Sequence, residues 1–190
     1  MRPRSIALLL ALLPLGGCWL LFNNDDGGDG GPPCEDDISG CSDDPSDFTE
    51  DPSCTLDGEL ELELGEGELE FSPLGPQELP EIHYGLQGGQ HVWMAVRVKN
   101  PDLERKQLKI RIKADYCNSS CEDAGNWVTD NLRELVADET TLQVTSENWF
   151  EQTRMLVTIY GWVGATERRI EMLVTDPCGR QGFVATSSFE

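Results

Sequence analysis

Basic residues are scarce in this 190-residue chain, which has 14 Lys and Arg against 35 Asp and Glu and a formal net charge of −21. Twelve of the acidic residues lie between Asn23 and Asp57, a stretch that contains no basic residue. Nucleic acids and anionic lipid surfaces repel a protein of this charge. We therefore expect no nucleic-acid partner, whereas a cationic partner or calcium stays open.

Catalytic motifs are missing as well. The chain has two histidines, no G-x-S-x-G nucleophile motif and no glycine-rich motif for binding phosphate. Among 35 acidic residues, no particular pair of carboxylates stands out as an acid and base. We expect a protein that is not an enzyme and has no cofactor, and we keep an enzyme of unknown class as an alternative.

Long apolar runs are limited to one, Ile6–Leu13, which follows Arg2 and Arg4 and ends at Leu15-Gly16-Gly17-Cys18. A basic start, an apolar run and small residues at its end are typical of a secretory signal peptide, here residues 1–17. The cysteine after the small residues resembles the bacterial lipobox. That resemblance implies that Cys18 carries two fatty acyl chains, such as palmitate, and becomes the mature N-terminus.

Two alternatives to lipidation remain. Ordinary signal cleavage needs no acylated cysteine. An uncleaved membrane span would use residues 6–22, but these reach only about 26 Å as a helix, while the hydrocarbon core is about 30 Å thick. A diacylated Cys18 supplies both signals that stable anchoring requires. The residue after it is Trp19 and not Asp, which favours sorting to the outer membrane.

Six cysteines remain once Cys18 is acylated, an even number that favours disulfides in an oxidising compartment. The closest pairs in the sequence predict the bridges Cys34–Cys41 and Cys117–Cys121, and the remaining two predict Cys54–Cys178. Zinc thiolates are the alternative, but the chain contains no C-x-x-C pair.

Residues 18–53 are expected to be a disordered acidic linker that carries the lipidated Cys18. The run Asn23–Pro33 contains no hydrophobic residue and cannot offset its ordering entropy. A glycine-rich coil of this length spans roughly 33 Å, which would hold a domain clear of the membrane. Its acidic residues lack the spacing of an EF-hand loop, so the linker interpretation is preferred to a calcium site.

Residues 54–190 are expected to form one all-β domain, an immunoglobulin-like sandwich of about seven to eight strands. Val92, Met94, Val96 and Val98 show the alternation of a half-buried strand. Similar patterns predict strands around residues 60–64, 69–71, 108–113, 141–145, 155–162, 169–175 and 182–186. Residues 132–136 fit either a short helix or a strand, and we favour a strand.

One strand alternates leucine with Glu59, Glu61 and Glu63. Charges of this kind keep an exposed strand from pairing with other molecules, which is the interpretation we favour. The alternative pairs them with the basic face of residues 109–113. An immunoglobulin-like order would place these two strands in different sheets.

The two histidines flank a turn-like segment, 85–89. A symmetric five-residue loop would place Tyr84 opposite Gln90 and His83 opposite His91. Both imidazoles would then share a face with Glu81, and two histidines with a carboxylate form a candidate zinc or copper site.

The stretch 63–100 and a late turn resemble uncharacterised lipoproteins of myxobacteria and their relatives. The residues that carry this resemblance are Glu63–Gly67, Phe71, Leu74, Leu79-Pro80, Gly85, Gln87-Gly88-Gly89, His91, Trp93, Arg97 and Asp176–Arg180. The resemblance implies an acylated, exported β-sandwich with no assigned activity and transfers no catalytic residue. The Cys117/Cys121 loop departs from the pattern of that group.

These features together predict a lipid-anchored, non-enzymatic β-sandwich in the bacterial cell envelope, at the outer membrane. It would contact the membrane through its lipid and recognise an envelope protein or a glycan through loops at one end. The alternative function is a metal-binding envelope module that uses His83 and His91.

Overall fold

The structure, a computed structural model, describes residues 41–189 except 43 and 87. The predicted signal peptide, Cys18, Cys34 and the linker up to residue 40 lie outside the described residues. The described part contains eleven strands, two short 3-10 helices and no α-helix. The helices are η1 (Pro45–Asp47) and η2 (Ala124–Asn126). The strands are β1 (Cys41–Ser42), β2 (Glu61–Glu66), β3 (Ser72–Pro73), β4 (His83–Tyr84), β5 (Gln90–Lys99), β6 (Leu108–Cys117), β7 (Val128–Ala137), β8 (Gln143–Val144), β9 (Trp149–Ile159), β10 (Glu167–Thr175) and β11 (Gln181–Phe189).

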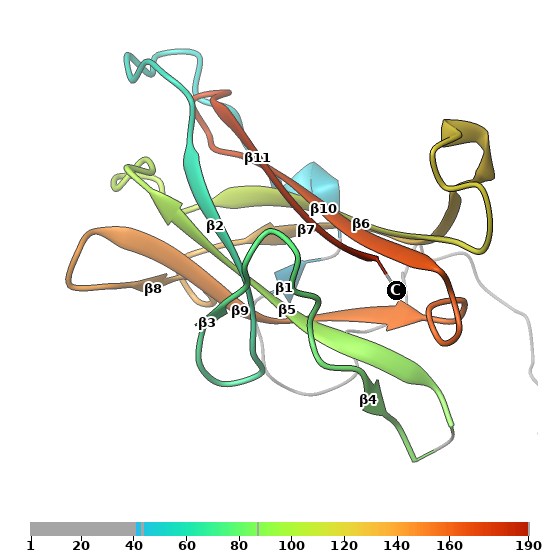
Figure 1. The fold of residues 1–190 in the computed structure, drawn as a ribbon. Coiled ribbons are helices and arrows are strands. Elements are labelled where there is room, and N and C mark those ends of the chain that lie inside the picture. The colour runs from blue at the N-terminus through green and yellow to red at the C-terminus, as the bar shows by residue number, and fades with distance from the viewer. Residues whose placement is uncertain (1–40, 43, 87, 190) are drawn as a thin grey trace, which may run out of the picture. The chain divides into compact units, whose positions relative to one another are not determined.

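The strands form two sheets, and every pairing is antiparallel (Figure 1). Sheet A has the order β1-β7-β6-β10-β11. Sheet B has the order β3-β2-β5-β9-β8, with β4 paired to one end of β5. The inner faces of the two sheets contribute to one hydrophobic core, so the chain is a β-sandwich.

The strand order confirms the immunoglobulin-like prediction. Seven strands have six or more residues, and the first, second and fifth of these lie together in sheet B. The fourth, third, sixth and seventh lie side by side in sheet A, which is the order of an immunoglobulin-like sandwich whose fourth strand pairs with the third. The count is higher than the expected seven to eight because four of the eleven described strands are only two residues long.

The core follows the alternation in the sequence. Val92, Met94, Val96 and Val98 of β5 are fully buried. The corresponding alternate residues of β6 and β10 face them from sheet A, and the two bulkiest core side chains are Trp162 and Phe150. Period-two burial is therefore the main reason that the sequence pattern predicts these strands well.

Two strand predictions were wrong, one because no strand forms there and one in its bounds. No strand forms at residues 69–71, because Gly67 (φ +140°) turns the chain there. The strand expected at 155–162 is β9, which begins at Trp149 and ends at Ile159. A β-bulge with Arg154 at φ +60° breaks its alternation, since Met94 pairs with Met155 but Val96 pairs with Gln152.

The acidic strand lies apart from the basic strand β6. Glu61 lies opposite Lys99 and Glu63 opposite Arg97, both in β5, whereas β6 belongs to the other sheet. Lys99 Nζ forms an ion pair of 3.0 Å with Glu61. The interpretation of these glutamates as an exposed charged face is therefore preferred to a pairing with residues 109–113.

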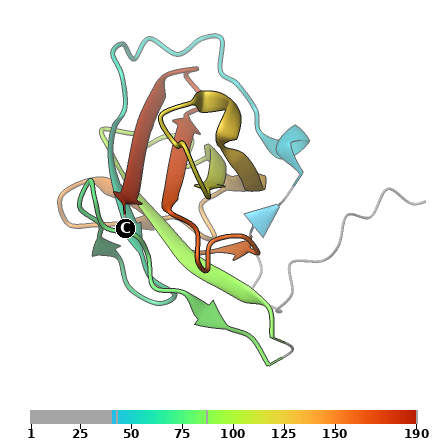
Figure 2. The ribbon, with the colours of Figure 1, turned by 45° about the vertical axis from the view of Figure 1, so that its right-hand side comes forward.

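Residues 44–54, here called the strap, contact the sandwich, although residues 44–53 were expected to belong to the linker. The Gln107 side chain accepts a hydrogen bond from the Thr49 amide (3.1 Å) and donates one to the Asp47 carbonyl (2.9 Å). Asp51 forms an ion pair of 2.8 Å with Arg105. Just before the strap, β1 pairs with β7 at the edge of sheet A. Figure 2 shows the strap in cyan beside the sandwich.

The sandwich has two ends that differ in their loops. The strap end carries residues 54–60, 100–107, 138–148 and 176–180. The far end carries residues 67–89, 118–127 and 160–166, and lies at the right of Figure 1, around β4 and the chain's C-terminus. Because strands alternate in direction, every loop belongs to one of these ends.

Candidate functional site

Two of the predicted disulfides are confirmed. Cys54 is bonded to Cys178, with 5.3 Å between their Cα atoms, and Cys117 is bonded to Cys121, with 5.7 Å. Cys41 lies in β1, but its predicted partner Cys34 lies outside the described residues.

The zinc-thiolate alternative is wrong for these four cysteines. Among the described residues, one set of three His, Cys, Asp or Glu side chains brings its ligand atoms within 4.8 Å of one another, namely Cys54, Asp102 and Cys178. Its two sulfurs belong to one disulfide, whereas zinc requires thiolates. His83, His91 and Glu81, the candidate metal ligands of the sequence, do not form a group of this kind among the described residues.

The two histidines lie in the predicted register. His83 of β4 pairs with His91 of β5, and Tyr84 pairs with Gln90. The ring centroids are 5.7 Å apart with 23° between the ring planes, and Trp93 meets His91 edge-on at 5.3 Å. Burial and the neighbouring His83 lower the pKa of His91 below its ordinary value, against the opposing effect of the Glu68 carboxylate.

The turn between these strands holds the pair in place. The Gly85 amide donates to the Gly89 carbonyl at 2.8 Å, and the Gly88 amide donates to the Gly85 carbonyl at 2.9 Å. Gly88 has φ +82°, a conformation that favours glycine. The glycines of the segment are thus a local cause of the register that brings the imidazoles together.

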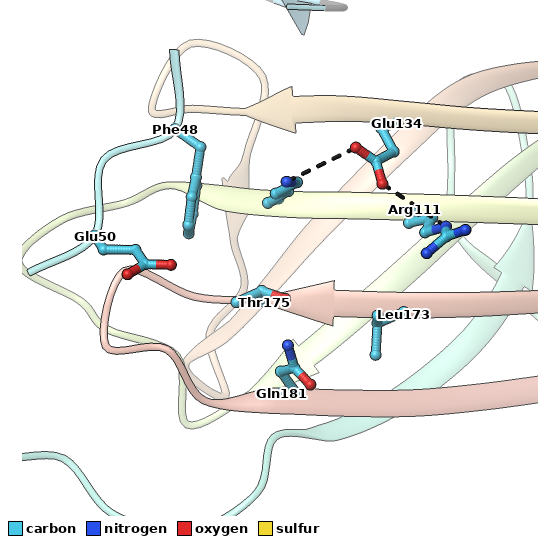
Figure 3. Close-up of a pocket in the computed structure, with 8 residues that line it drawn as sticks. Phe48, Glu50, Arg111, Glu134, Leu173, Thr175 and Gln181 are labelled. Carbon is cyan, nitrogen blue, oxygen red and sulfur yellow. Dashed lines mark ion pairs between the residues drawn. The ribbon is translucent and has the colours of Figure 1, made fainter. Parts of the chain in front are cut away.

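A groove lies between the strap and the outer face of sheet A (Figure 3). Phe48 and Glu50 border it on the strap side, and the sheet contributes Lys109, Arg111, Glu134, Leu173, Thr175 and Gln181. Its volume of about 250 Å³ is below the range usual for small-molecule sites. Both of its cations pair with Glu134, each at 3.7 Å, so the groove has no excess of positive charge for an anion.

The loops of the far end expose large apolar side chains. Tyr84 is 67% exposed, Tyr160 75% and Val163 57%, and Leu86 is fully exposed. Val128, at the start of β7, is 47% exposed and lies at the same end of the sandwich. The strand patterns did not predict these exposed residues. The sequence signal that could have done so is an apolar residue within a glycine-rich turn, as in Tyr84-Gly85-Leu86.

One far-end loop, residues 118–127, is held at both of its ends. The Cys117–Cys121 bridge closes its first turn, and Trp127 Nε1 donates a hydrogen bond to the Cys121 carbonyl at 2.9 Å. The Arg169 guanidinium lies 4.3 Å from the centroid of the Trp127 ring. Asp123 caps η2 by accepting from the Gly125 amide. A loop ordered in advance loses less entropy when it binds a partner.

No protein-family model matches the chain, and no curated protein is similar to it in sequence. Within residues 41–189, no helix is long and apolar enough to cross a membrane.

Proposed function

We propose that the chain is a lipid-anchored protein of the bacterial cell envelope, at the outer membrane, and that its sandwich is a non-enzymatic binding module. The observation that supports this most is the placement of exposed Tyr84, Leu86, Tyr160 and Val163 at the end opposite the strap. The described chain reaches the sandwich at β1, which pairs with the last residues of β7, and continues into the strap at the same end. An anchor at Cys18 would therefore hold the strap end nearer the membrane and present the far end.

An envelope protein is the partner that this surface fits better than a glycan. Exposed apolar side chains on constrained loops supply desolvation energy to a protein interface, and tyrosine is enriched at such interfaces. Retention of protein-free polar extracts by the sandwich would instead identify a glycan as the partner.

The anchor is tested by labelling cells with radioactive palmitate. Wild type is expected to incorporate the label and Cys18→Ser to lose it. Cys34→Ser is the matched control, because it removes a cysteine that we expect to be in a disulfide, and it should stay labelled. Equal labelling of the wild type and Cys18→Ser would overturn the anchor.

Photo-crosslinking in cells tests the binding surface with the full chain. A photoreactive residue at Leu86 should yield a defined adduct, whereas one at Leu103, an exposed leucine of the strap end at 49%, should not. Adducts of the same size and yield from both positions, or none from Leu86, would contradict a far-end binding surface. Protease treatment of the adduct separates a protein partner from a glycan.

A further inference from the structure

The face of sheet B near the far end carries an imidazole pair that the recognition surface does not use. His83 and His91 are both half-buried and lie directly opposite each other on antiparallel strands. Two imidazoles bound to one metal ion have their ring centroids about 4.5–6.4 Å apart, as the angle at the metal opens from square to linear. The observed 5.7 Å lies inside that range.

We propose that His83 and His91 together bind one divalent transition-metal ion, Cu²⁺ most tightly. Imidazole nitrogens suit copper, nickel and zinc, and the affinity of such ligands peaks at Cu²⁺. Oxygen ligands from water would complete the coordination of the ion at this half-buried site.

The Glu68 carboxylate acts on His91, where it raises the pKa against the effects of burial and of His83. Glu68 also lies 3.8 Å from Arg154. It thus adds negative potential beside the pair while its own charge is partly balanced. The backbone amide of Glu81, the residue suggested by the sequence, donates a hydrogen bond to the Glu66 carboxylate.

Metal binding would link β4 to β5, which at present share only two paired residues on each strand. The same short hairpin carries Tyr84 and Leu86. An ion at this position would therefore stabilise the turn that presents these side chains. The metal site itself does not depend on the proposed recognition function.

The test is a titration of the metal-free mature chain with Cu²⁺, in which tryptophan fluorescence is measured at each addition. The ring centroids of Trp93 and His91 are 5.3 Å apart, so a Cu²⁺ ion bound to the imidazole quenches the emission of Trp93. We expect saturable quenching with one equivalent in the wild type, and an affinity at least about tenfold lower in His83→Ala and in His91→Ala. Tyr84→Ala is the matched control, since it changes the same short strand and keeps both imidazoles.

The acidic N-terminal region offers other oxygen ligands to copper, and the difference between wild type and the histidine variants removes their contribution. Circular dichroism of each variant checks that it is folded. Paramagnetic resonance of the copper complex should show coupling to two nitrogens in the wild type. Quenching that is absent from the wild type, or retained in both histidine variants, would overturn the site.

Discussion

At the scale of single residues, Asp115 is a buried charge of sheet A that is held by two cations. Its side chain is buried, and one carboxylate oxygen accepts hydrogen bonds from Lys113 Nζ at 2.7 Å and from Arg169 at 2.6 Å. Burial raises the pKa of Asp115, but hydrogen bonds from Arg169, Lys113 and Thr129 outweigh it and hold the pKa below the ordinary value. Since Arg169 also stacks on Trp127, this carboxylate connects sheet A to the root of a far-end loop.

Asp115→Asn should lower the free energy of unfolding at neutral pH by about 1–3 kcal/mol, because it leaves two cations without their buried partner. A pKa that is lower in the folded chain means that the unfolded chain binds more protons in this range. The stabilisation is therefore present above the ordinary pKa of 3.8 and is lost as the pH falls through the folded value.

Urea denaturation at neutral pH and near pH 3 measures both effects. The difference between wild type and Asp115→Asn should shrink in acid. Glu171→Gln is the control, because its side chain is 27% exposed and its loss should cost less than about 1 kcal/mol. An equal difference at both pH values would show that the charge of Asp115 is not what stabilises the fold.

Gly161 lies so close to another side chain that a larger residue does not fit at this position. A Cβ atom at this position would overlap the ring of Tyr116. Gly161→Ala should therefore destabilise the chain by about 1–3 kcal/mol through overpacking. Gly89→Ala is the matched control, since a Cβ there has open space and φ lies outside the left-handed region. Similar melting temperatures for the two variants would contradict this account.

At the scale of elements, local alternation was enough to predict β5, β6, β10 and the register of the histidine turn. The residues on which these predictions rested alternate with period two, and the histidine register follows from a short glycine turn; both are local properties of the sequence. The bulge at Arg154 shows where this reasoning stops, because one inserted residue moves every later side chain of β9 to the other phase.

The strap was missed for a different reason. Its residues are acidic and contain little that could be buried, so composition alone favours a linker. Its order depends on side chains more than fifty positions away, such as Gln107 and Arg105. Contacts of that sequence separation are not encoded in any local pattern. The far-end apolar residues were also missed, since only the fold places the three loops at one end.

Gln107→Ala should release the strap, because this side chain makes both a donor and an acceptor contact with it. Hydrogen exchange of the Thr49 amide is expected to accelerate by about tenfold, the equivalent of one hydrogen bond. Lys106→Ala is the control, as that neighbouring side chain is exposed. Unchanged exchange at Thr49 in Gln107→Ala would mean that the strap is held by its other contacts alone.

At the scale of the whole molecule, the strap is tied to the sandwich by a disulfide, an ion pair and hydrogen bonds at the end opposite the exposed apolar loops. Asp176 is fully buried and binds Arg180 through two contacts of 2.9 and 2.6 Å, and Arg180 also donates to the Asn100 carbonyl. The Asp51 amide donates to the Pro177 carbonyl in the same turn. The strap is therefore tied to the β10–β11 turn by a main-chain hydrogen bond and by the Cys54–Cys178 bridge.

The two disulfides should differ in their contribution to stability, and the difference follows from the length of chain that each closes. Cys54 and Cys178 are 124 positions apart, whereas Cys117 and Cys121 are 4 apart. The loop-entropy relation gives about 5 kcal/mol for the long bridge and about 2 kcal/mol for the short one. The Cys54→Ala/Cys178→Ala variant should therefore lose more than twice as much free energy of unfolding as Cys117→Ala/Cys121→Ala, as measured by urea denaturation.

Each double substitution removes two sulfurs, so each variant is the control for the other. Equal losses would mean that native contacts around the bridges, and not the restricted unfolded chain, decide their effect. If the long bridge instead costs less, the ionic contacts of the strap end already hold Cys54 near Cys178 without the covalent bond.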